Sequence, residues 1–213
     1  MTVFSICNIK GGSGKSTTAI HLAAYLHNKK IKTAVVDCDG QQTISAWINL
    51  VSNLEDVTIF KSTNPDDIED AILELEQTHD AVIVDVAGSS EELMKIVLSL
   101  SNRTLIPLAP SPLDITSTVS TIKQVIRARR RTAKEISATV LLNKVVKNTT
   151  LAQETREMFV NYDGIEFSSV EVPQTQRLMK LASNRQTVFD SSENKDIAKL
   201  YTQIFKEFTG GRS

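Results

Sequence analysis

A glycine-rich loop near the N-terminus constrains the fold of this chain more than any other stretch. Residues 10–17 read Lys-Gly-Gly-Ser-Gly-Lys-Ser-Thr, after an apolar run at residues 3–7 and before a helical pattern at residues 18–28. A strand, a glycine turn and a helix in this order form a phosphate-binding loop, in which backbone N–H groups and the positive end of the helix surround an anion. Lys15 adds a full positive charge for the β- and γ-phosphates, and the Ser16 hydroxyl is placed to bind Mg²⁺.

Short apolar runs alternate with helical patterns along the rest of the chain, which is typical of a parallel sheet between helices. The later predicted strands lie at residues 34–37, 57–60, 81–85, 104–108, 138–142 and 169–173. We therefore expect an α/β fold with a doubly wound, mostly parallel sheet and helices on both faces. One domain should span residues 1–209, with a frayed tail at 210–213.

Aspartates end two of these predicted strands, at the edge of the sheet where doubly wound folds bind ligands. Asp85 closes the run at 81–85, and a carboxylate there can hold Mg²⁺ through a water molecule. Asp37 and Asp39 follow the run at 34–37. Either of these two can instead lie in a solvated turn or cap the helix predicted near residues 43–50.

The loop departs from the common phosphate-loop pattern, G-x-x-x-x-G-K-[ST]. That pattern needs glycine where this chain has Ile9, and a second lysine stands at position 10. In this form, K-G-G-x-G-K-[ST], the loop resembles the deviant Walker A loop of the ParA/MinD-like ATPases, closest to small ParA-type plasmid or chromosome partition ATPases. The resemblance covers nearly the whole chain. It implies that ATP is bound by Lys10, Gly11, Gly12, Ser13, Gly14, Lys15, Ser16 and Thr17, with Asn143 and Pro173 at the base.

The resemblance also implies which residues are catalytic. These are Lys10, which reaches the phosphates of a second copy, Lys15, and Asp39, which orients the attacking water. Asp39 matches the second aspartate of the family segment D-x-D-P-Q, although Gly40 replaces its proline and makes the loop less stiff. The implied magnesium ligands are Ser16, Asp39 and Asp85.

The implied activity is ATP hydrolysis to ADP and phosphate at a weak intrinsic rate, with ATP and Mg²⁺ as cofactors. The ATP-bound protein would be a homodimer that binds non-specific DNA and is stimulated by a ParB-like or centromere-binding partner. It would be cytoplasmic and nucleoid-associated, without a transmembrane segment. A MinD-like positioning ATPase acting on a membrane or protein cargo is the alternative. A metabolic or cofactor-loading ATPase is disfavoured, because Cys7 and Cys38 do not form a suitable cysteine pair.

Two basic clusters are candidates for contact with DNA. The formal net charge of −1 predicts no overall attraction to nucleic acid, so a local patch must supply it. The candidates are Arg127, Arg130, Arg131 and Lys134 on a long predicted helix, and Arg177, Lys180 and Arg185 nearer the C-terminus. Either cluster can equally be a solvated face, and the sequence does not choose between them.

The last helical pattern, at residues 197–208, repeats its apolar residues at helical spacing. We expect this helix to pack on the sheet; a helix lying on a membrane surface is the alternative.

Overall fold

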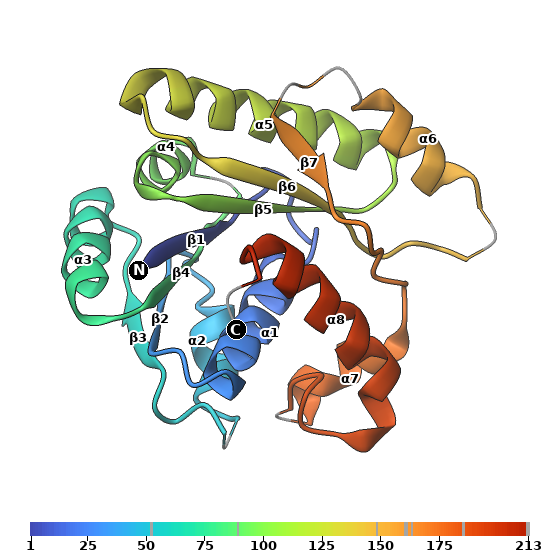
Figure 1. Ribbon diagram of the computed structural model, residues 1–213, viewed down its shortest axis with the longest axis horizontal. Helices are drawn as coiled ribbons and strands as arrows, with labels where there is room; N and C mark the ends of the chain where they lie inside the picture. The colour runs from blue at the N-terminus through green and yellow to red at the C-terminus, as the bar shows by residue number, and fades with distance from the viewer. Residues whose placement is uncertain are drawn as a thin grey trace.

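The computed structural model describes residues 1–51, 53–88, 90–147, 149–159, 162, 164–184 and 186–211. Its centre is a seven-stranded sheet in the order β3-β2-β4-β1-β5-β6-β7, with every neighbouring pair parallel (Figure 1). The strands are β1 (Thr2–Ile6), β2 (Thr33–Asp37), β3 (Thr58–Lys61), β4 (Ala81–Asp85), β5 (Arg103–Leu108), β6 (Ser137–Leu142) and β7 (Ile165–Phe167). The helices are α1 (Lys15–Asn28), α2 (Thr43–Ile48), α3 (Pro65–Thr78), α4 (Glu91–Leu100), α5 (Pro112–Thr132), α6 (Leu151–Met158), α7 (Gln176–Ser183) and α8 (Lys195–Phe208), with a 3₁₀ turn at Ser192–Asn194.

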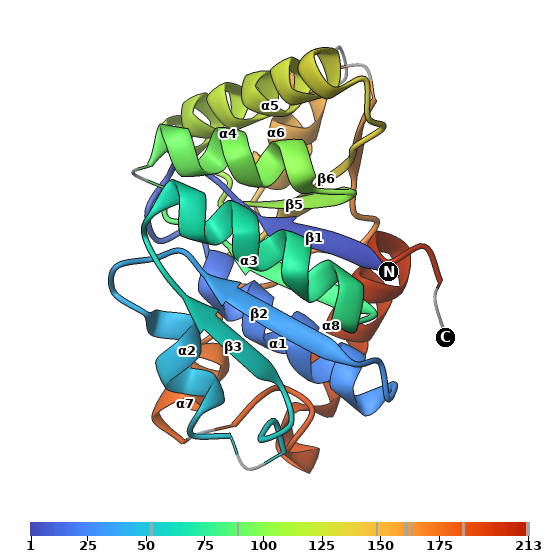
Figure 2. The ribbon, with the colours of Figure 1, turned by 90° about the vertical axis from the view of Figure 1, so that its left-hand side faces the viewer.

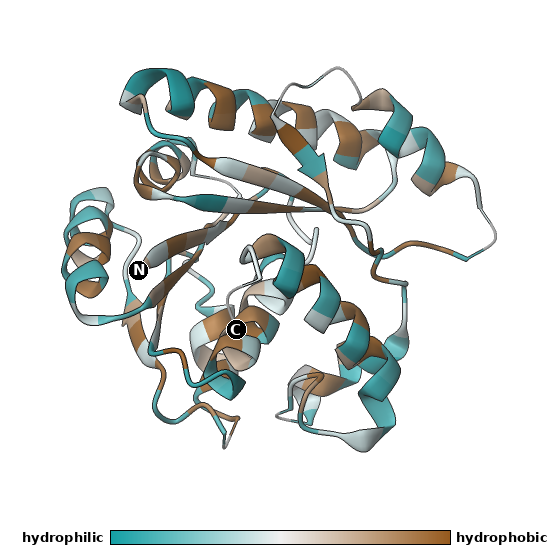
Figure 3. Ribbon diagram, in the orientation of Figure 1, coloured by the Kyte–Doolittle hydropathy of each residue, from teal (hydrophilic) through white to brown (hydrophobic). Residues whose placement is uncertain are grey.

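Helices cover both faces of the sheet, which confirms the predicted doubly wound architecture. One apolar core lies under α1, α2, α7 and α8, and a second lies under α3, α4, α5 and α6 (Figures 1 and 2). Strand β1 contributes to both cores, because Phe4 and Ile6 face the first while Val3 faces the second. The central strands are accordingly mostly apolar, whereas hydrophobic and hydrophilic residues alternate along the helices (Figure 3).

Helix α8 buries its apolar side against the sheet, as predicted. Ile197, Tyr201, Ile204 and Phe208 are buried, and the Phe208 ring lies 5.4 Å from the Phe4 ring of β1. This side is therefore not available to lie on a membrane surface. Nor does any helix in the described part of the chain have the length and apolar character that crossing a bilayer requires.

The prediction of a regular strand at residues 169–173 is wrong. The last strand is β7, and Pro173 makes only an isolated bridge to Val145. The reason is a local interruption of the pairing with β6: the Ser168 N–H donates to the Val140 carbonyl at 3.0 Å and the Val172 N–H donates to the Leu142 carbonyl at 2.9 Å, but the residues between them are held elsewhere. The Glu207 carboxylate of α8 accepts hydrogen bonds from the Ser168 hydroxyl and the Ser169 backbone N–H, both 3.1 Å long.

The chain end beyond α8 is described only in part. Gly210 and Gly211 have positive φ angles of 72° and 70° and form the turn that ends α8, while residues 212–213 lie outside the described residues. The frayed tail at 210–213 stays a prediction, as does the single-domain boundary at residue 209.

A buried histidine joins three helices on the first face. His21 of α1 has no exposed surface, and neither ring nitrogen has a hydrogen-bond partner among the described residues. Its ring packs edge-on against Tyr201 of α8 at 4.8 Å and Trp47 of α2 at 5.7 Å. Burial without a partner lowers the pKa of His21 from 6.5 to about 3. The folded protein therefore holds this imidazole in its neutral form.

Acidification should destabilise the protein through His21. The unfolded chain binds a proton on this residue below about pH 6.5, whereas the folded chain does so only near pH 3. The free energy of unfolding should therefore fall by up to about 1.4 kcal/mol per pH unit between these values from this residue alone. Urea denaturation from about pH 7 to about pH 4 measures the slope, which His21→Phe should reduce. His27→Phe, at the half-exposed last turn of the same helix, should leave it in place. An unchanged slope in His21→Phe contradicts the assignment.

Candidate functional site

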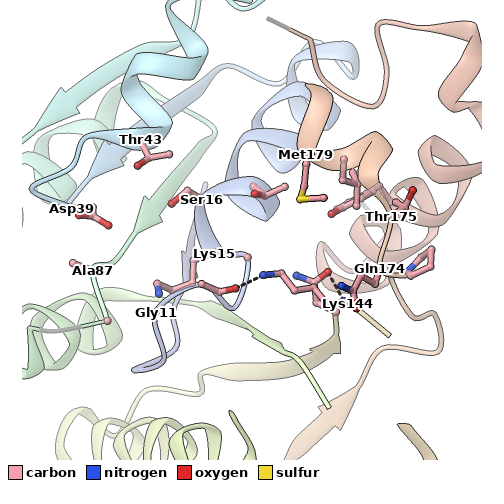
Figure 4. A pocket seen from close by; sticks show the side chains of 18 of the residues that line it. Gly11, Lys15, Ser16, Asp39, Thr43, Ala87, Lys144, Gln174, Thr175 and Met179 are labelled. Atoms are coloured by element: carbon pink, nitrogen blue, oxygen red, sulfur yellow. Dashed lines mark hydrogen bonds between the residues drawn. The ribbon is translucent and has the colours of Figure 1, made fainter. Parts of the chain in front are cut away.

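A cavity of about 680 Å³ opens at the carboxyl ends of the central strands (Figure 4). The predicted site residues that line it are Gly11, Gly12, Gly14, Lys15, Ser16, Thr17, Asp39, Asn143 and Pro173. Lys10, Ser13 and Asp85 are outside the lining. Asp39 and Ala87 lie on one side of the glycine loop, and Lys144, Gln174 and Thr175 lie on the other. The structure thus brings together residues from five separate segments of the chain.

The glycine loop has the backbone conformation that an anion-binding loop requires. Gly12 and Gly14 have φ angles of 74° and 100°, in the left-handed region, and Gly14 is the N-cap of α1. A side chain at Gly14 would also place its Cβ 2.2 Å from Nδ2 of Asn143. The loop therefore ends at the positive end of α1 with its backbone closely packed.

Lys15 is held inside this loop. Its side chain is only 8% exposed, and Nζ donates a 3.1 Å hydrogen bond to the backbone carbonyl of Lys10. Burial lowers the pKa of Lys15, and the nearby Asp85 carboxylate opposes this effect. A partly desolvated ammonium at this position attracts an anion more strongly than a solvated one does.

Asp85 carries a buried carboxylate close to Lys15 and Ser16. It is 1% exposed, and neither oxygen has a hydrogen-bond partner among the described residues. Burial raises its pKa to about 7; the Ser16 hydroxyl and Lys15 lower it, while Asp37 and Asp39 raise it further. A carboxylate without a partner beside a serine hydroxyl fits a hard divalent cation. Within the described residues no three His, Cys, Asp or Glu side chains form a metal cluster by themselves, so water and phosphate oxygens would complete the coordination.

The two neighbouring aspartates have different surroundings. Asp37 is buried, and its carboxylate accepts hydrogen bonds from the Ser45 N–H at 3.0 Å, the Ser45 hydroxyl at 2.6 Å and the Asp39 N–H at 3.1 Å. It therefore anchors the first turn of helix α2 from outside the helix; the N-cap position itself is Gln42, so the N-cap alternative is wrong for Asp37. Asp39 accepts a hydrogen bond from the Gln41 N–H at 2.9 Å and lines the cavity.

Sequence reasoning missed Asn8, which fixes the start of the loop. This side chain is fully buried, and Nδ2 donates to the Pro107 carbonyl at 2.8 Å and to the Thr118 hydroxyl at 2.9 Å. Its Oδ1 accepts the Lys10 N–H at 3.0 Å. A buried amide must be satisfied, so these bonds tie the loop to β5 and α5. An asparagine directly after an apolar strand is the signal that could have found it.

Sequence reasoning also missed Lys144, which braces the middle of the loop. Lys144 has a left-handed φ of 57°, and its Nζ donates a 2.6 Å hydrogen bond to the Gly12 carbonyl. The adjacent Asn143 donates from Nδ2 to the Ser13 carbonyl at 2.8 Å. Both residues follow β6, so the end of this strand clamps the loop from a segment 130 residues away. Contact of Asn143 with adenine stays a prediction.

The two predicted basic clusters differ in how their charges are used. Arg127, Arg130 and Arg131 are exposed on α5, and no ion pair among the described residues involves them. In contrast, Arg177 forms a two-pronged bond with Asp196, at 2.8 and 2.6 Å.

The remaining candidates do not follow this division between the two clusters. Lys134 donates to the Leu100 carbonyl at 2.7 Å and so helps to end helix α4. Lys180 is exposed on α7, and Arg185 lies outside the described residues.

Comparison with known proteins agrees with this geometry. Residues 4–188 match the family described as the CobQ/CobB/MinD/ParA nucleotide binding domain. Protein ParA of Rhizobium radiobacter is 27% identical over 145 residues, which is 68% of this chain and 65% of that protein. Maintenance of carboxysome distribution protein A of Halothiobacillus neapolitanus is 30% identical over 143 residues, 66% of this chain and 65% of that protein. The chain thus covers slightly less than two-thirds of each relative.

The fold also matches solved structures closely. The ATP complex of a McdA variant from Cyanothece superposes with a TM-score of 0.80, covering 100% of this chain and 98% of that one at 16% sequence identity. At this identity the likeness concerns the fold.

Removing the Lys144 brace should weaken nucleotide binding. In Lys144→Met the Gly12 carbonyl loses a charged donor, and the loop is free to relax. We expect the dissociation constant for ATP to rise by about tenfold, because a charged hydrogen bond of this kind contributes roughly 1.5 kcal/mol. Titration calorimetry with a non-hydrolysable ATP analogue measures it. Lys144→Arg should recover most of the affinity, and Lys147→Met, on the exposed chain three residues later, should change nothing. Equal affinities in Lys144→Met and the parent protein would remove the proposed brace.

Proposed function

This chain belongs to the CobQ/CobB/MinD/ParA nucleotide-binding family, and from that premise we propose that it is an ATP-driven partition ATPase that binds DNA. The observation that carries the proposal is the glycine loop itself. It presents two lysines, one buried and one outside its own cavity, next to a buried carboxylate without a partner. Because Lys10 does not line its own cavity, its ammonium is available to a second molecule.

The nucleotide site is proposed as follows. Backbone N–H groups of residues 11–17 and the Lys15 ammonium hold the phosphates. Ser16, Asp39 and Asp85 hold Mg²⁺, which when bound neutralises charge on the phosphates. Asp39 lines the cavity and orients the attacking water, while Asn143 and Pro173 border the base.

Lys10 is proposed to act on a second copy of the chain. Its backbone is fixed by the Asn8 side chain, yet the residue does not line its own cavity. Two chains facing each other across two ATP molecules would each lend this cation to the other's γ-phosphate, as an arginine finger does in trans. The ATP-bound protein is therefore proposed to be a homodimer.

DNA contact is proposed for Arg127, Arg130 and Arg131, which form no ion pair within the described residues, because Arg177 of the other cluster is already neutralised by Asp196. A dimer doubles these contacts, so binding should follow the nucleotide state. On this proposal the protein is cytoplasmic and associated with the nucleoid, and a ParB-like or centromere-binding partner stimulates hydrolysis. The similarity to a carboxysome distribution protein favours a second candidate, the MinD-like positioning of a protein cargo. The buried apolar side of α8 does not support a membrane cargo.

The two lysines of the loop should have separable roles. Lys15→Ala removes the cation inside the loop, so ATP affinity should fall by about a hundredfold or more. Lys10→Ala should keep ATP affinity within about threefold, because the residue is outside its own cavity. It should nevertheless stay monomeric in light scattering with a non-hydrolysable analogue, where the parent protein dimerises. A monomeric parent protein under saturating analogue, or a dimeric Lys10→Ala variant, contradicts the shared-lysine proposal.

Binding to arbitrary duplex DNA should require ATP and weaken with salt. Each phosphate contact contributes about 0.9 to the slope of log affinity against log salt concentration. The triple change of Arg127, Arg130 and Arg131 to Gln should therefore lower that slope by about two to three. Arg177→Gln is the control and should leave it nearly unchanged. Filter retention with ATP, ADP and no nucleotide measures the effect. No retention by the ATP-loaded protein would exclude the partition role in favour of cargo positioning.

A further inference from the structure

A basic cleft lies between α4 and α5, on the outer side of the helical layer. The two helices pack side by side (Figure 2), and a hollow of about 220 Å³ opens between them. Helix α4 lines it with Lys95, Ile96 and Ser99, and α5 lines it with Arg127, Ala128 and Arg131. We call this hollow the α4–α5 cleft. It was not visible in the sequence, because Lys95 and the arginines lie more than thirty positions apart.

The cleft combines an apolar floor with a cationic rim. Ile96 is half-buried and Ala128 is 6% exposed, so the floor between the helices is hydrocarbon. Arg127 and Arg131 lie one helical turn apart at its edge. The described residues that line the cleft include no carboxylate. Glu91, next to the cleft, pairs with Lys95 at 3.2 Å and lies close enough to Arg127 for that charge to lower its pKa, so it partly offsets the positive charge at this end of the cleft.

Arg127 and Arg131 are also proposed to contact DNA, so a peptide bound in the cleft would compete with DNA for these two side chains; the apolar floor favours the peptide inside the cleft. A DNA phosphate would bind the arginines but would gain nothing from Ile96 and Ala128, because phosphate is strongly hydrated. An acidic peptide offers carboxylates that arginine forks bind in two-pronged geometry and an aliphatic side chain for the floor. We propose that the α4–α5 cleft docks an acidic segment of a partner protein, with one apolar side chain on the floor and carboxylates on Arg127 and Arg131.

The start of α4 connects the cleft to the nucleotide cavity. Ala87 and Gly88, just before α4, line that cavity, and a Cβ at Gly88 would lie 2.4 Å from the Ile9 carbonyl of the glycine loop. At the first turn of α4, Oε1 of Glu91 accepts hydrogen bonds from Gln124 of α5 at 2.9 Å and pairs with Lys95 of the cleft. A peptide that pulls Lys95 from Glu91 therefore acts on the helix that begins at the rim of the cavity. This second step rests on the proposed function, since it makes the docked partner a regulator of hydrolysis.

The test uses a synthetic peptide in which Glu and Leu alternate, and a matched peptide in which Gln replaces Glu. Fluorescence anisotropy measures binding to the full chain without nucleotide. We expect only the Glu–Leu peptide to bind. The double variant Lys95→Gln with Arg131→Gln, and separately the single variant Ile96→Ser, should each lower its affinity about fivefold to tenfold. Arg130→Gln removes a neighbouring charge that does not line the cleft and should weaken binding less than about twofold. Circular dichroism confirms that each variant is folded.

Three outcomes overturn the docking proposal. The first is that the peptide fails to bind. The second is that Arg130→Gln weakens peptide binding as much as the cleft variants do, which indicates a diffuse electrostatic attraction. The third is that Lys95→Gln and Ile96→Ser weaken duplex DNA binding and leave peptide binding intact, which assigns the cleft to DNA. A binding peptide that leaves the ATPase rate unchanged overturns the link to the cavity. Because the anisotropy assay needs no ATP, its failure is distinguishable from a failure of the ATPase proposal, which the lysine variants detect.

Discussion

The inward-turned backbone of the glycine loop is the constraint on which the rest of this structure depends. A loop with exposed N–H groups around an anion site has few hydrogen bonds of its own, so other segments must hold it. Asn8 ties its start to β5 and α5, and Asn143 and Lys144 take the carbonyls of Ser13 and Gly12. The parallel sheet brings these segments to one edge. The order of the strands therefore helps to hold the loop in its conformation.

The buried charges of the site lower the free energy of unfolding. Lys15 and Asp85 are both buried, and the Asp85 oxygens have no hydrogen-bond partner among the residues described. Burying such groups without satisfying them costs free energy, and proteins retain that cost where a ligand recovers it. Asp37, two residues from Asp39, is fully satisfied by Ser45 and stabilises the fold instead. Asp37 and Asp85 therefore differ in role: the Asp37 carboxylate accepts hydrogen bonds from Ser45 and Asp39, whereas the Asp85 oxygens have no partner among the residues described.

Helix α4 is placed to connect the two surfaces for which we propose ligands. Its first turn follows the segment that lines the nucleotide cavity, and its middle turn borders the α4–α5 cleft. Gly88 lies too close to the glycine loop to accommodate a side chain. If the docking proposal holds, we expect a displacement of α4 to reach the glycine loop through this close contact, since packed interiors transmit strain. Helix α4 thus lines the cleft and begins next to the segment that lines the nucleotide cavity.

The sequence by itself determined the features that depend on neighbouring residues. The glycine loop, the aspartates at strand ends and the apolar side of α8 all follow from local spacing, and the structure has them where they were predicted. Only the tertiary structure decided that the pairing with β6 is interrupted at residues 169–171, because the cause is Glu207 on a distant helix. It also decided that Lys144 braces the loop, that Asp37 anchors α2, and that Arg177 is paired while the α5 arginines have no ion-pair partner in the described chain. Each of these depends on hydrogen bonds or ion pairs whose partners the chain brings together only by folding, and spacing along the sequence carries no information about them.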